Sequence, residues 1–514
     1  MVAAALVVAG PNGRGATNAP QWVWGLSGYT IAGRAVTTDA SGNVYVTGGF
    51  GGTAAFGTTN LTSGPDGDVF VAKVDPSGQV LWVAQGRGTD SYSNIGNGVA
   101  VDSRGNVYVA GRFSGTLDFG TTNLNSGYFT WWDVFLAKFD PQGRCEWAWQ
   151  GNSGESSYTY GLAVAVDAND EVVISGHYRY RIYFRSVGEG AENRTSSLTN
   201  TESAFVAKFD GAGQIQWVRE IASYAQNWHE ANALAIDEDR NIHVTGHFSR
   251  EGYFGDEEEG LASRGVSDIF VAKYNAAGEL QWVRQAGCTE DGNDEDDSYD
   301  VGLGIAVDRV GSVFVTGSFS APEATFGTTN LSAGNVRDFF LAKYDSGGAL
   351  QWVRKSLEST REGVSVAVDD AGDVYAMPAL RRFVQKYDGA GNLLWTQGAD
   401  AGSQAKPHAI AVGRDGSKYV AGEQLGPLSG VSSAGPYVFL AKLGNAGTGP
   451  RLGITASAES IVISWPVAAI DYSPQVADSF REWRGLSGAV GTNGALRTLT
   501  LPRPSQNQFY RLQK

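Results

Sequence analysis

Cysteine and long apolar runs are scarce in this sequence. Its 514 residues include two cysteines, Cys145 and Cys288, at different places of non-adjacent repeats. Because a disulfide needs a narrow geometry, we expect no bridge between them. No apolar run is long enough to cross a membrane, and no long stretch has the periodicity of an amphipathic helix. We therefore expect neither a transmembrane helix nor a helical domain.

Basic residues are also in the minority. The sequence has 39 Lys and Arg against 54 Asp and Glu, which gives a formal net charge of -15. Such a charge repels the phosphate backbone of nucleic acids and anionic lipid headgroups. Nucleic acid is therefore not an expected partner.

Signatures of known catalytic sites are absent. The sequence contains no G-x-S-x-G elbow, no H-E-x-x-H pair, no Walker loop and no dinucleotide-binding fingerprint before a helix. Because a fold can host catalysis without a short motif, this absence argues against an enzyme without excluding one.

What the sequence does contain is a repeat, clearest between Gly304 and Trp352. Alternating apolar residues predict four short strands in this copy, over residues 304–307, 312–316, 338–343 and 349–354. Tight Asp- and Gly-containing turns separate the first strand from the second and the third from the fourth. Repeats of this length are typical of propellers, solenoids or arrays.

Three markers count the copies. The first turn has an aspartate in six copies and Gly413 in the seventh, and the third strand has a phenylalanine in all seven. A fourth-strand tryptophan occurs in the first six copies, whereas a spare strand of this kind, Gln21 to Gly25, precedes the first copy. These counts predict a closed ring: an all-β, seven-bladed β-propeller completed by its N-terminal strand. A linear β-solenoid is the alternative.

Most repeated residues have structural explanations. The turn aspartates, such as Asp39 and Asp102, can accept backbone N–H bonds while a nearby glycine adopts a positive φ. The fourth-strand tryptophans, such as Trp282, are expected to be core residues that fill the widening space between blades. Function is therefore expected where the copies differ.

The chain divides into four parts. Residues 1–19 have the apolar core and small residues of a secretory signal but lack its basic start, so they are a signal-like or disordered segment. The predicted propeller follows at 20–445, then a linker at 446–451 and a small β-sandwich-like domain at 452–514.

The repeat resembles a known family. The pattern A-V-D-x-x-G-N-V-Y-V-T-G-x-F followed by D-V-F-V-A-K, seen from Ala100 to Trp147 and from Ala306 to Trp352, is similar to the bacterial SBBP-type β-propeller repeat. The insert Phe-Gly-Thr-Thr-Asn-Leu is similar to that family too, and the C-terminal segment resembles β-modules on secreted proteins of Verrucomicrobia-like bacteria. The resemblance implies a secreted or surface protein and transfers no catalytic residue.

The connections between strands predict two different faces. The short turns share one face, which we call the uniform-turn face. The longer loops share the other, the variable-loop face, where binding residues are expected. Equivalent positions near this face hold Arg112, His177, His247 and Glu423, which would form a polar ring at the channel mouth. Two histidines could bind a metal, but a third ligand is not evident.

Aromatic residues recur in the loops that connect one blade to the next. Serine–tyrosine pairs include Tyr92, Tyr158, Tyr224 and Tyr299, and Trp228 lies in a loop of the same kind. These rings could stack on a sugar or peptide, or they could pack on one another and plug the channel. The sequence leaves both alternatives open.

One loop is strongly acidic. Asp291, Asn293, Glu295 and Asp297 alternate as oxygen ligands do in calcium loops, but the glycine and distal glutamate of an EF-hand are wrongly placed. A solvated acidic loop explains the same residues. We expect no cofactor, with Ca2+ as the one candidate.

The sequence favours a monomeric, non-enzymatic binding or scaffold protein, secreted or at the cell surface. Its ligand would be an extracellular glycan or protein, bound on the variable-loop face by the ring residues and loop aromatics. The alternative is a polysaccharide-acting hydrolase or lyase whose site is formed by Arg112, His177, His247 and Glu423. That alternative requires the four side chains to converge.

Overall fold

The computed structural model describes the chain in segments. These are residues 22–29, 32–65, 67–89, 94–126, 131–151, 158–184, 194–195, 202–221, 228–255, 260–288, 299–320, 323–333, 337–355, 363–378, 384–397, 404–425, 436–443, 453–456, 460–466, 473–477, 484–485, 490–493, 496–502 and 509–513. Every regular element in these segments is a β-strand. One compact unit covers Trp22–Leu443, and a second unit follows it in the chain.

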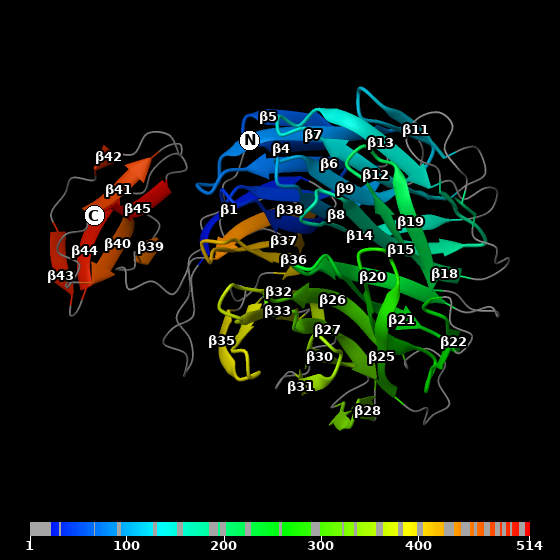
Figure 1. The fold of residues 1–514 in the computed structure, drawn as a ribbon. Coiled ribbons are helices and arrows are strands. Elements are labelled where there is room, and N and C mark those ends of the chain that lie inside the picture. Colours follow the sequence, from blue (N-terminus) through cyan, green and yellow to red (C-terminus); the bar gives the residue numbers. More distant parts are fainter. Residues whose placement is uncertain are drawn as a thin grey trace. The chain divides into compact units, whose positions relative to one another are not determined.

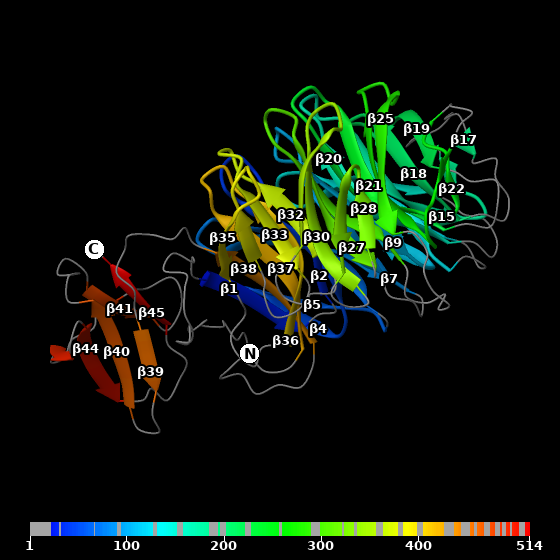
Figure 2. The same ribbon diagram turned by 90° about the horizontal axis from the view of Figure 1, so that it is seen from below.

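The first unit is a seven-bladed β-propeller, which confirms the predicted all-β fold (Figure 1, Figure 2). Its blades are antiparallel four-stranded sheets. Blade one consists of β2 (Ala32–Thr38), β3 (Val44–Phe50), β6 (Asp68–Val74) and β7 (Val80–Gly88). Blade two consists of β8 (Ile95–Val101), β9 (Val107–Phe113), β12 (Asp133–Phe139) and β13 (Cys145–Gly151). Blade three consists of β14 (Thr159–Val166), β15 (Val172–Arg179), β18 (Glu202–Phe209) and β19 (Ile215–Ile221).

Blades four to six repeat the same arrangement. Blade four consists of β20 (His229–Ile236), β21 (Ile242–Phe248), β24 (Asp268–Tyr274) and β25 (Leu280–Cys288). Blade five consists of β26 (Val301–Val307), β27 (Val313–Ser320), β30 (Arg337–Tyr344) and β31 (Leu350–Lys355). Blade six consists of β32 (Gly363–Val368), β33 (Val374–Pro378), β34 (Val384–Tyr387) and β35 (Leu393–Gln397).

Blade seven joins the two ends of the ring. It consists of β36 (Gln404–Val412), β37 (Lys418–Leu425), β38 (Pro436–Leu443) and the first strand of the chain, β1 (Trp22–Tyr29). β1 pairs antiparallel with β38, from Trp22 opposite Leu443 to Tyr29 opposite Tyr437. The predicted closure is confirmed, because the N-terminal strand covers the edge of β38 that would otherwise be open.

The innermost strand of every blade contains a β-bulge that the sequence reading missed. In blade five this strand begins at Val301, three residues before the predicted start at Gly304. A register shift at the same place in each inner strand leaves one residue without a partner in the ladder. These bulge residues are Arg34, Asn97, Leu162, Asn232, Leu303, Val364 and His408.

The bulge explains the repeated glycine of the second strand. A Cβ atom on Gly317 would lie 1.9 Å from the carbonyl oxygen of Val301, and one on Gly48 would lie 1.9 Å from that of Ala32. No side chain fits at such a distance, so the close approach of the two strands requires glycine there.

The predicted inserts form hairpins that extend to neighbouring blades. They are β4 (Thr53–Phe56) with β5 (Thr59–Thr62), β10 (Thr116–Asp118) with β11 (Asn123–Asn125), and β28 (Glu323–Phe326) with β29 (Thr329–Ser332). β10 pairs with β7, and β28 pairs with β25, in each case the outer strand of the preceding blade. Two further hairpins are β16 (Tyr183–Phe184) with β17 (Arg194–Thr195) and β22 (Glu251–Gly252) with β23 (Leu261–Ala262).

The turn aspartates act as the sequence predicted. Asp39 Oδ1 accepts the backbone N–H groups of Ser41 and Asn43, each at 2.9 Å, while Gly42 has a φ of 79°. These bonds stabilise the turn locally and need no ligand.

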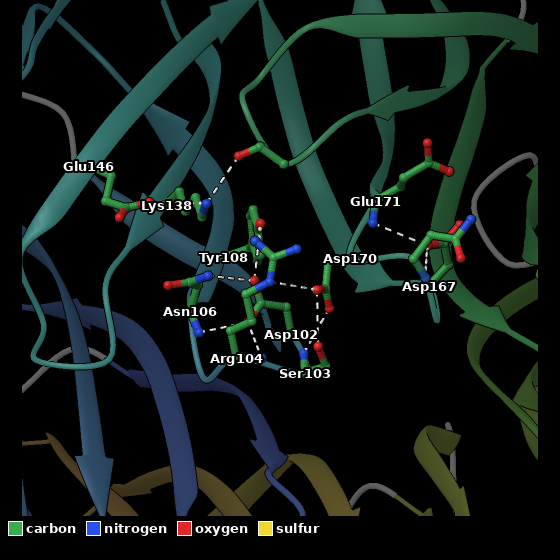
Figure 3. A network of polar contacts seen from close by, with 12 residues as sticks. Asp102, Ser103, Arg104, Asn106, Tyr108, Lys138, Glu146, Asp167, Asp170 and Glu171 are labelled. Carbon is green, nitrogen blue, oxygen red and sulfur yellow. Dashed lines mark hydrogen bonds and ion pairs between the residues drawn. The ribbon is translucent and has the colours of Figure 1, made fainter.

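The corresponding turn of blade three has a different role. Asp170 stands where most blades have glycine and has a φ of 60°. Its carboxylate accepts the N–H of Ser103 at 2.9 Å and pairs with Arg104 at 3.2 Å (Figure 3). Both partners belong to the first turn of blade two, so this turn connects two blades.

The fourth-strand tryptophans link blades and are not all core residues, which corrects the prediction. Each of five indole N–H groups donates to a turn carbonyl of the next blade at 3.0–3.3 Å; the donors are Trp82, Trp147, Trp217, Trp282 and Trp352. Trp217 and Trp395 are buried, whereas the other four are half-buried. The reason is their place on the outer strand, where the neighbouring turn covers only part of the ring.

The second unit contains two sheets. β39 (Gly453–Ala456), β40 (Ser460–Pro466), β44 (Leu496–Pro502) and β43 (Val490–Asn493) form one, and β42 (Arg484–Gly485), β41 (Ser473–Ala477) and β45 (Phe509–Gln513) form the other. The predicted small β-domain begins in the same region, and its packing as a sandwich stays a prediction.

The sequence predicted neither a disulfide nor a transmembrane helix, and the described residues bear on both predictions. Cys145 and Cys288 are both free and buried, as expected. Burial raises the pKa of the Cys145 thiol to about 11, so this thiol is neutral at pH 7. Within the described segments, no helix has the length and apolar character needed to cross a membrane.

Candidate functional site

The four residues of the predicted polar ring lie at equivalent positions in four blades. Arg112 is on β9, His177 on β15, His247 on β21 and Glu423 on β37. Each pairs with a residue near the start of its inner strand; in order, the partners are Ile95, Tyr160, Glu230 and Lys406. The second strands end close to these positions, so all four residues lie near the variable-loop face.

Arg112 stacks with aromatic rings of blades two and three. Its guanidinium carbon is 5.0 Å from the centroid of Trp132 and 4.7 Å from that of Tyr160. Tyr158 stacks on Tyr160 with centroids 5.3 Å apart and planes 19° apart. The ring of His177 meets Tyr160 edge-on at 4.6 Å. These contacts give the guanidinium a favourable cation–π environment.

A second group of rings comes from blades four and five. Trp228 is 5.3 Å from His247 and 6.0 Å from Tyr299, measured between ring centroids. Its indole N–H donates to Glu230 Oε1 at 3.1 Å, and the same oxygen lies 3.5 Å from His177 Nδ1. Glu230 therefore connects the two groups, which together we call the aromatic cluster: Arg112, Trp132, Tyr158, Tyr160, His177, Trp228, Glu230, His247 and Tyr299.

Burial controls the charges inside the aromatic cluster. It lowers the pKa of His177 to about 3 and that of His247 to about 4, so both imidazoles are neutral at pH 7. Burial also raises the pKa of Glu230 to about 7, although its hydrogen bond from Trp228 favours the ionised form. The short distance between His177 and Glu230 is therefore a contact of a neutral imidazole and not a salt bridge.

The rings pack on one another and still leave surface free. Trp228 is 42% exposed, and Trp131, whose ring lies 6.3 Å from Trp132, is 58% exposed. The inner rings pack on one another and cover the histidines, as one alternative predicted, while the outer indoles face solvent; stacking on a ligand stays a prediction.

Glu423 lies in a separate group of blades seven and one. Its carboxylate is 3.1 Å from Lys406 Nζ and 4.0 Å from His408 Nε2. Arg34 is close enough for its charge to interact with Glu423; burial lowers the pKa of Arg34, and Glu423 partly offsets this effect. We call Arg34, Lys406, His408 and Glu423 the basic group.

The structure thus divides the predicted ring. Arg112, His177 and His247 belong to the aromatic cluster, whereas Glu423 belongs to the basic group. Within the described segments, no hydrogen bond or ion pair joins any two of these four residues. Both histidines are buried beside aromatic rings. The convergence that the enzyme alternative requires is not present in this part of the chain.

Several predicted residues lie outside the described segments. They are Tyr92, Tyr224 and the four calcium-ligand candidates Asp291, Asn293, Glu295 and Asp297. Elsewhere in the described chain, no group of three or more His, Cys, Asp or Glu side chains is placed to hold a metal ion. Calcium binding by the acidic loop stays a prediction.

Sequence reasoning missed several residues that the structure brings to this face. Glu230 follows His229 directly and pairs with His247 across the strands, so only the strand register identifies it. Arg34 and His408 are bulge residues flanked by small or ring-constrained residues, in Gly33-Arg34-Ala35 and Pro407-His408-Ala409. That pattern of one larger residue in each inner strand was the available signal.

The chain is similar to one repeat family and to two curated proteins. The model of the SBBP family, a beta-propeller repeat, matches residues 81–112. The uncharacterized WD repeat-containing protein L264 of Acanthamoeba polyphaga mimivirus is 26% identical over 410 residues, covering 66% of this chain and 29% of that protein. The regulatory protein FlaEY of Caulobacter vibrioides is 33% identical over 120 residues, covering 23% of this chain and 12% of that protein. This chain spans less than a third of either curated relative.

Solved propeller structures resemble the chain at low sequence identity. The WD40 β-propeller domain of Doa1 has a TM-score of 0.43 at 11% identity, covering 82% of this chain and 96% of that chain. A streptogramin B lyase has a TM-score of 0.40 at 10% identity, covering 82% of this chain and 99% of that chain. At these identities, neither likeness bears on function.

Proposed function

We propose that this protein is a non-enzymatic binding protein, secreted or at the cell surface, that takes a carbohydrate chain on its variable-loop face. The observation that carries this proposal is the aromatic cluster, at whose border the indoles of Trp131 and Trp228 are 58% and 42% exposed. Ligand sites are typically lined by aromatic side chains with a few fixed polar groups.

The chemistry of the cluster suits a sugar. An indole face can cover the apolar C–H face of a sugar ring, and its edge can donate a hydrogen bond. Hydroxyl groups of a sugar need donors and acceptors beside such a face. Tyr158, whose hydroxyl donates to Glu202 at 2.8 Å, and Glu230, which accepts from Trp228 at 3.1 Å, supply acceptors with their remaining lone pairs.

The arrangement supports binding more than catalysis. A catalytic site needs its acid, base and substrate-positioning groups around one point. Arg112 is held between Trp132 and Tyr160, whereas Glu423 is engaged by Lys406 in another blade. The separation of Glu423 from Arg112 and the two histidines therefore favours binding over the hydrolase or lyase alternative.

A glycan array with the purified full chain tests the proposal. We expect retention of a defined set of glycans, and we expect Trp228→Ala and Trp131→Ala each to weaken binding of the best glycan about tenfold or more. Leu394→Ala removes another exposed apolar side chain, 49% exposed on β35 of the outer edge, and is the matched control.

The possible outcomes separate the alternatives. Loss of binding in both tryptophan variants with an unchanged Leu394→Ala variant supports a glycan site at the aromatic cluster. Failure to retain any glycan, with capture of a peptide ligand instead, contradicts the carbohydrate assignment. Shortening of the bound glycan during incubation contradicts the non-enzymatic assignment.

A further inference from the structure

Two arginines on this face have no carboxylate partner in the described chain. Arg34 is solvent-exposed and makes no ion pair within the described segments. The guanidinium of Arg112 lies on the rings of Trp132 and Tyr160, and its buried Nε has no hydrogen-bond partner there. In a chain with a net charge of -15, arginines that form no ion pair with a carboxylate are not explained by a shortage of acidic residues.

The two arginines lie in adjacent blades near the same rim. Arg34 is the bulge residue of β2 in blade one, and Arg112 is on β9 in blade two. The blades approach closely here: a Cβ on Gly49 of blade one would lie 3.0 Å from the carbonyl oxygen of Asn94 and 3.3 Å from Ile95, the residue paired with Arg112. Glycine at this position therefore allows blade one to pack against the start of β8.

The two cations disfavour each other. Arg34 is accessible to solvent yet has protein around much of its side chain, and this burial lowers the pKa of Arg34. The charge of Glu423 raises that pKa, and the charge of Arg112 lowers it to a smaller extent. Glu423 is itself engaged by Lys406 at 3.1 Å. Counting Arg34, Arg112 and Lys406 against Glu423 and the partly ionised Glu230 still leaves an excess of positive charge beside the aromatic cluster.

We propose that the sugar bound on this face is an acidic one, and that Arg34, assisted by Arg112 of the neighbouring blade, binds its carboxylate. This inference rests on the glycan-binding function proposed above and adds the ligand class. The planar fork of a guanidinium matches a carboxylate in geometry, and such charge-assisted bonds are stronger than neutral ones. The aromatic rings would cover the sugar ring while the arginines recognise its acidic substituent.

Titration calorimetry with three hexasaccharides tests this inference. The probes are a galacturonic acid hexamer, the neutral galactose hexamer and a sulfated galactose hexamer. We expect the wild-type protein to bind the carboxylated hexamer about tenfold more tightly than the neutral one. Raising NaCl from 50 to 300 mM is expected to weaken binding of the carboxylated hexamer several-fold and to leave the neutral one unchanged.

Variants at Arg34 assign the effect to this residue. Arg34→Gln is expected to remove most of the preference for the acid without weakening the neutral hexamer, and Arg34→Lys is expected to retain part of it. Arg104→Gln is the control, because Arg104 is 74% exposed and pairs with Asp170 on the uniform-turn face.

Each contrary result has a distinct meaning. Equal affinities for the carboxylated and neutral hexamers in the wild-type protein, with no salt effect, overturn the acidic-ligand inference and leave glycan binding intact. Tighter binding of the sulfated hexamer than of the carboxylated one overturns the assignment to carboxylate. Absence of binding to all three, together with an empty glycan array, overturns the proposed function itself. If Arg34→Gln does not fold, the salt dependence of the wild-type protein still decides whether the ligand is acidic, and an Arg34→Lys variant that keeps the full preference overturns the assignment to Arg34.

Discussion

The two faces of the propeller use tryptophan in different ways. On the uniform-turn face, Trp282 donates its N–H to Ser346 of the next blade at 3.1 Å, and its ring lies under Gly348. On the variable-loop face, Trp228 donates to Glu230 near its own loop and leaves 42% of its surface exposed. The first environment recurs in blade after blade, whereas the second occurs at one place.

This difference shows how a repeat protein separates stability from recognition. A residue repeated in every blade meets the same neighbour in the next blade, so its polar groups are satisfied by the fold. A residue that occurs once has no repeated neighbour and can remain available to a ligand. Function in this protein is therefore expected among the aromatic cluster and the basic group, and not among the repeat residues.

The largest expected effect is a difference in the free energy of unfolding between variants of the two kinds of tryptophan. Trp282→Ala should lower the free energy of unfolding by about 2 to 4 kcal/mol, because it removes a half-buried indole and a hydrogen bond between blades. Trp131→Ala should change it by less than about 0.5 kcal/mol, because that indole is 58% exposed. Denaturant unfolding followed by circular dichroism measures both values. Equal losses in the two variants would remove the distinction between the faces.

A smaller effect concerns the buried carboxyl group of the aromatic cluster. Burial raises the pKa of Glu230 from 4.5 to about 7, so the folded protein prefers the protonated form. Its contribution to stability is therefore fully present below about pH 4.5 and is lost as the pH rises towards 7. Glu230→Gln should stabilise the protein at pH 8 relative to wild type, by on the order of 2 kcal/mol, and should have little effect at pH 4.5.

Melting temperatures measured from pH 4.5 to 8 check this prediction. A variant whose advantage over wild type is the same at every pH would contradict the raised pKa. Some pH dependence should persist in Glu230→Gln, because burial also raises the pKa of Asp300 to about 7. Asp300→Asn is the matched comparison. Asp300 accepts the N–H of Ser320, and at the equivalent place of blade two an asparagine, Asn94, accepts the N–H of Ser114, so asparagine can make the same hydrogen bond.

The smallest expected effect on stability concerns two turn residues with a positive φ on the uniform-turn face. Arg240 and Asp170 both have a positive φ, 64° and 60°, where most blades have glycine. Arg240→Gly should stabilise the protein by about 1 kcal/mol, because it relieves the left-handed conformation. Asp170→Gly should give no such gain, because it removes the bonds to Ser103 and Arg104. Thermal unfolding of the two variants side by side measures this, and an equal gain in both would show that the contacts of Asp170 contribute little.

Much of the fold could be predicted from the sequence because its information is local and repeated. Asp39 and Gly42 specify a turn without any distant partner. The missing tryptophan strand of the last copy and the spare strand before the first were enough to predict that β1 pairs with β38. The β-bulges were missed, because an alternating pattern assumes an unbroken register and a bulge interrupts it.

The candidate site was predictable only in part. The loop aromatics and the ring positions were found by comparing copies, but the grouping of His177 with Glu230, and of Glu423 with Lys406, depends on the register between strands. Trp131 has no repeated counterpart of the same kind, so counting copies gave no signal for it, whereas Arg34 was marked only as the larger residue between Gly33 and Ala35.

The sequence by itself determined the number of blades, the order of the strands, the turns and the closure of the ring. Each of these follows from short motifs whose conformations are set by neighbours along the chain. The tertiary structure decided which loop and strand-end side chains share an environment. It placed Arg112 on Trp132 and Tyr160, buried the histidines beside them and, within the described segments, left Arg34 without an ion pair. These contacts join adjacent blades, and only the packing of complete sheets against one another fixes them.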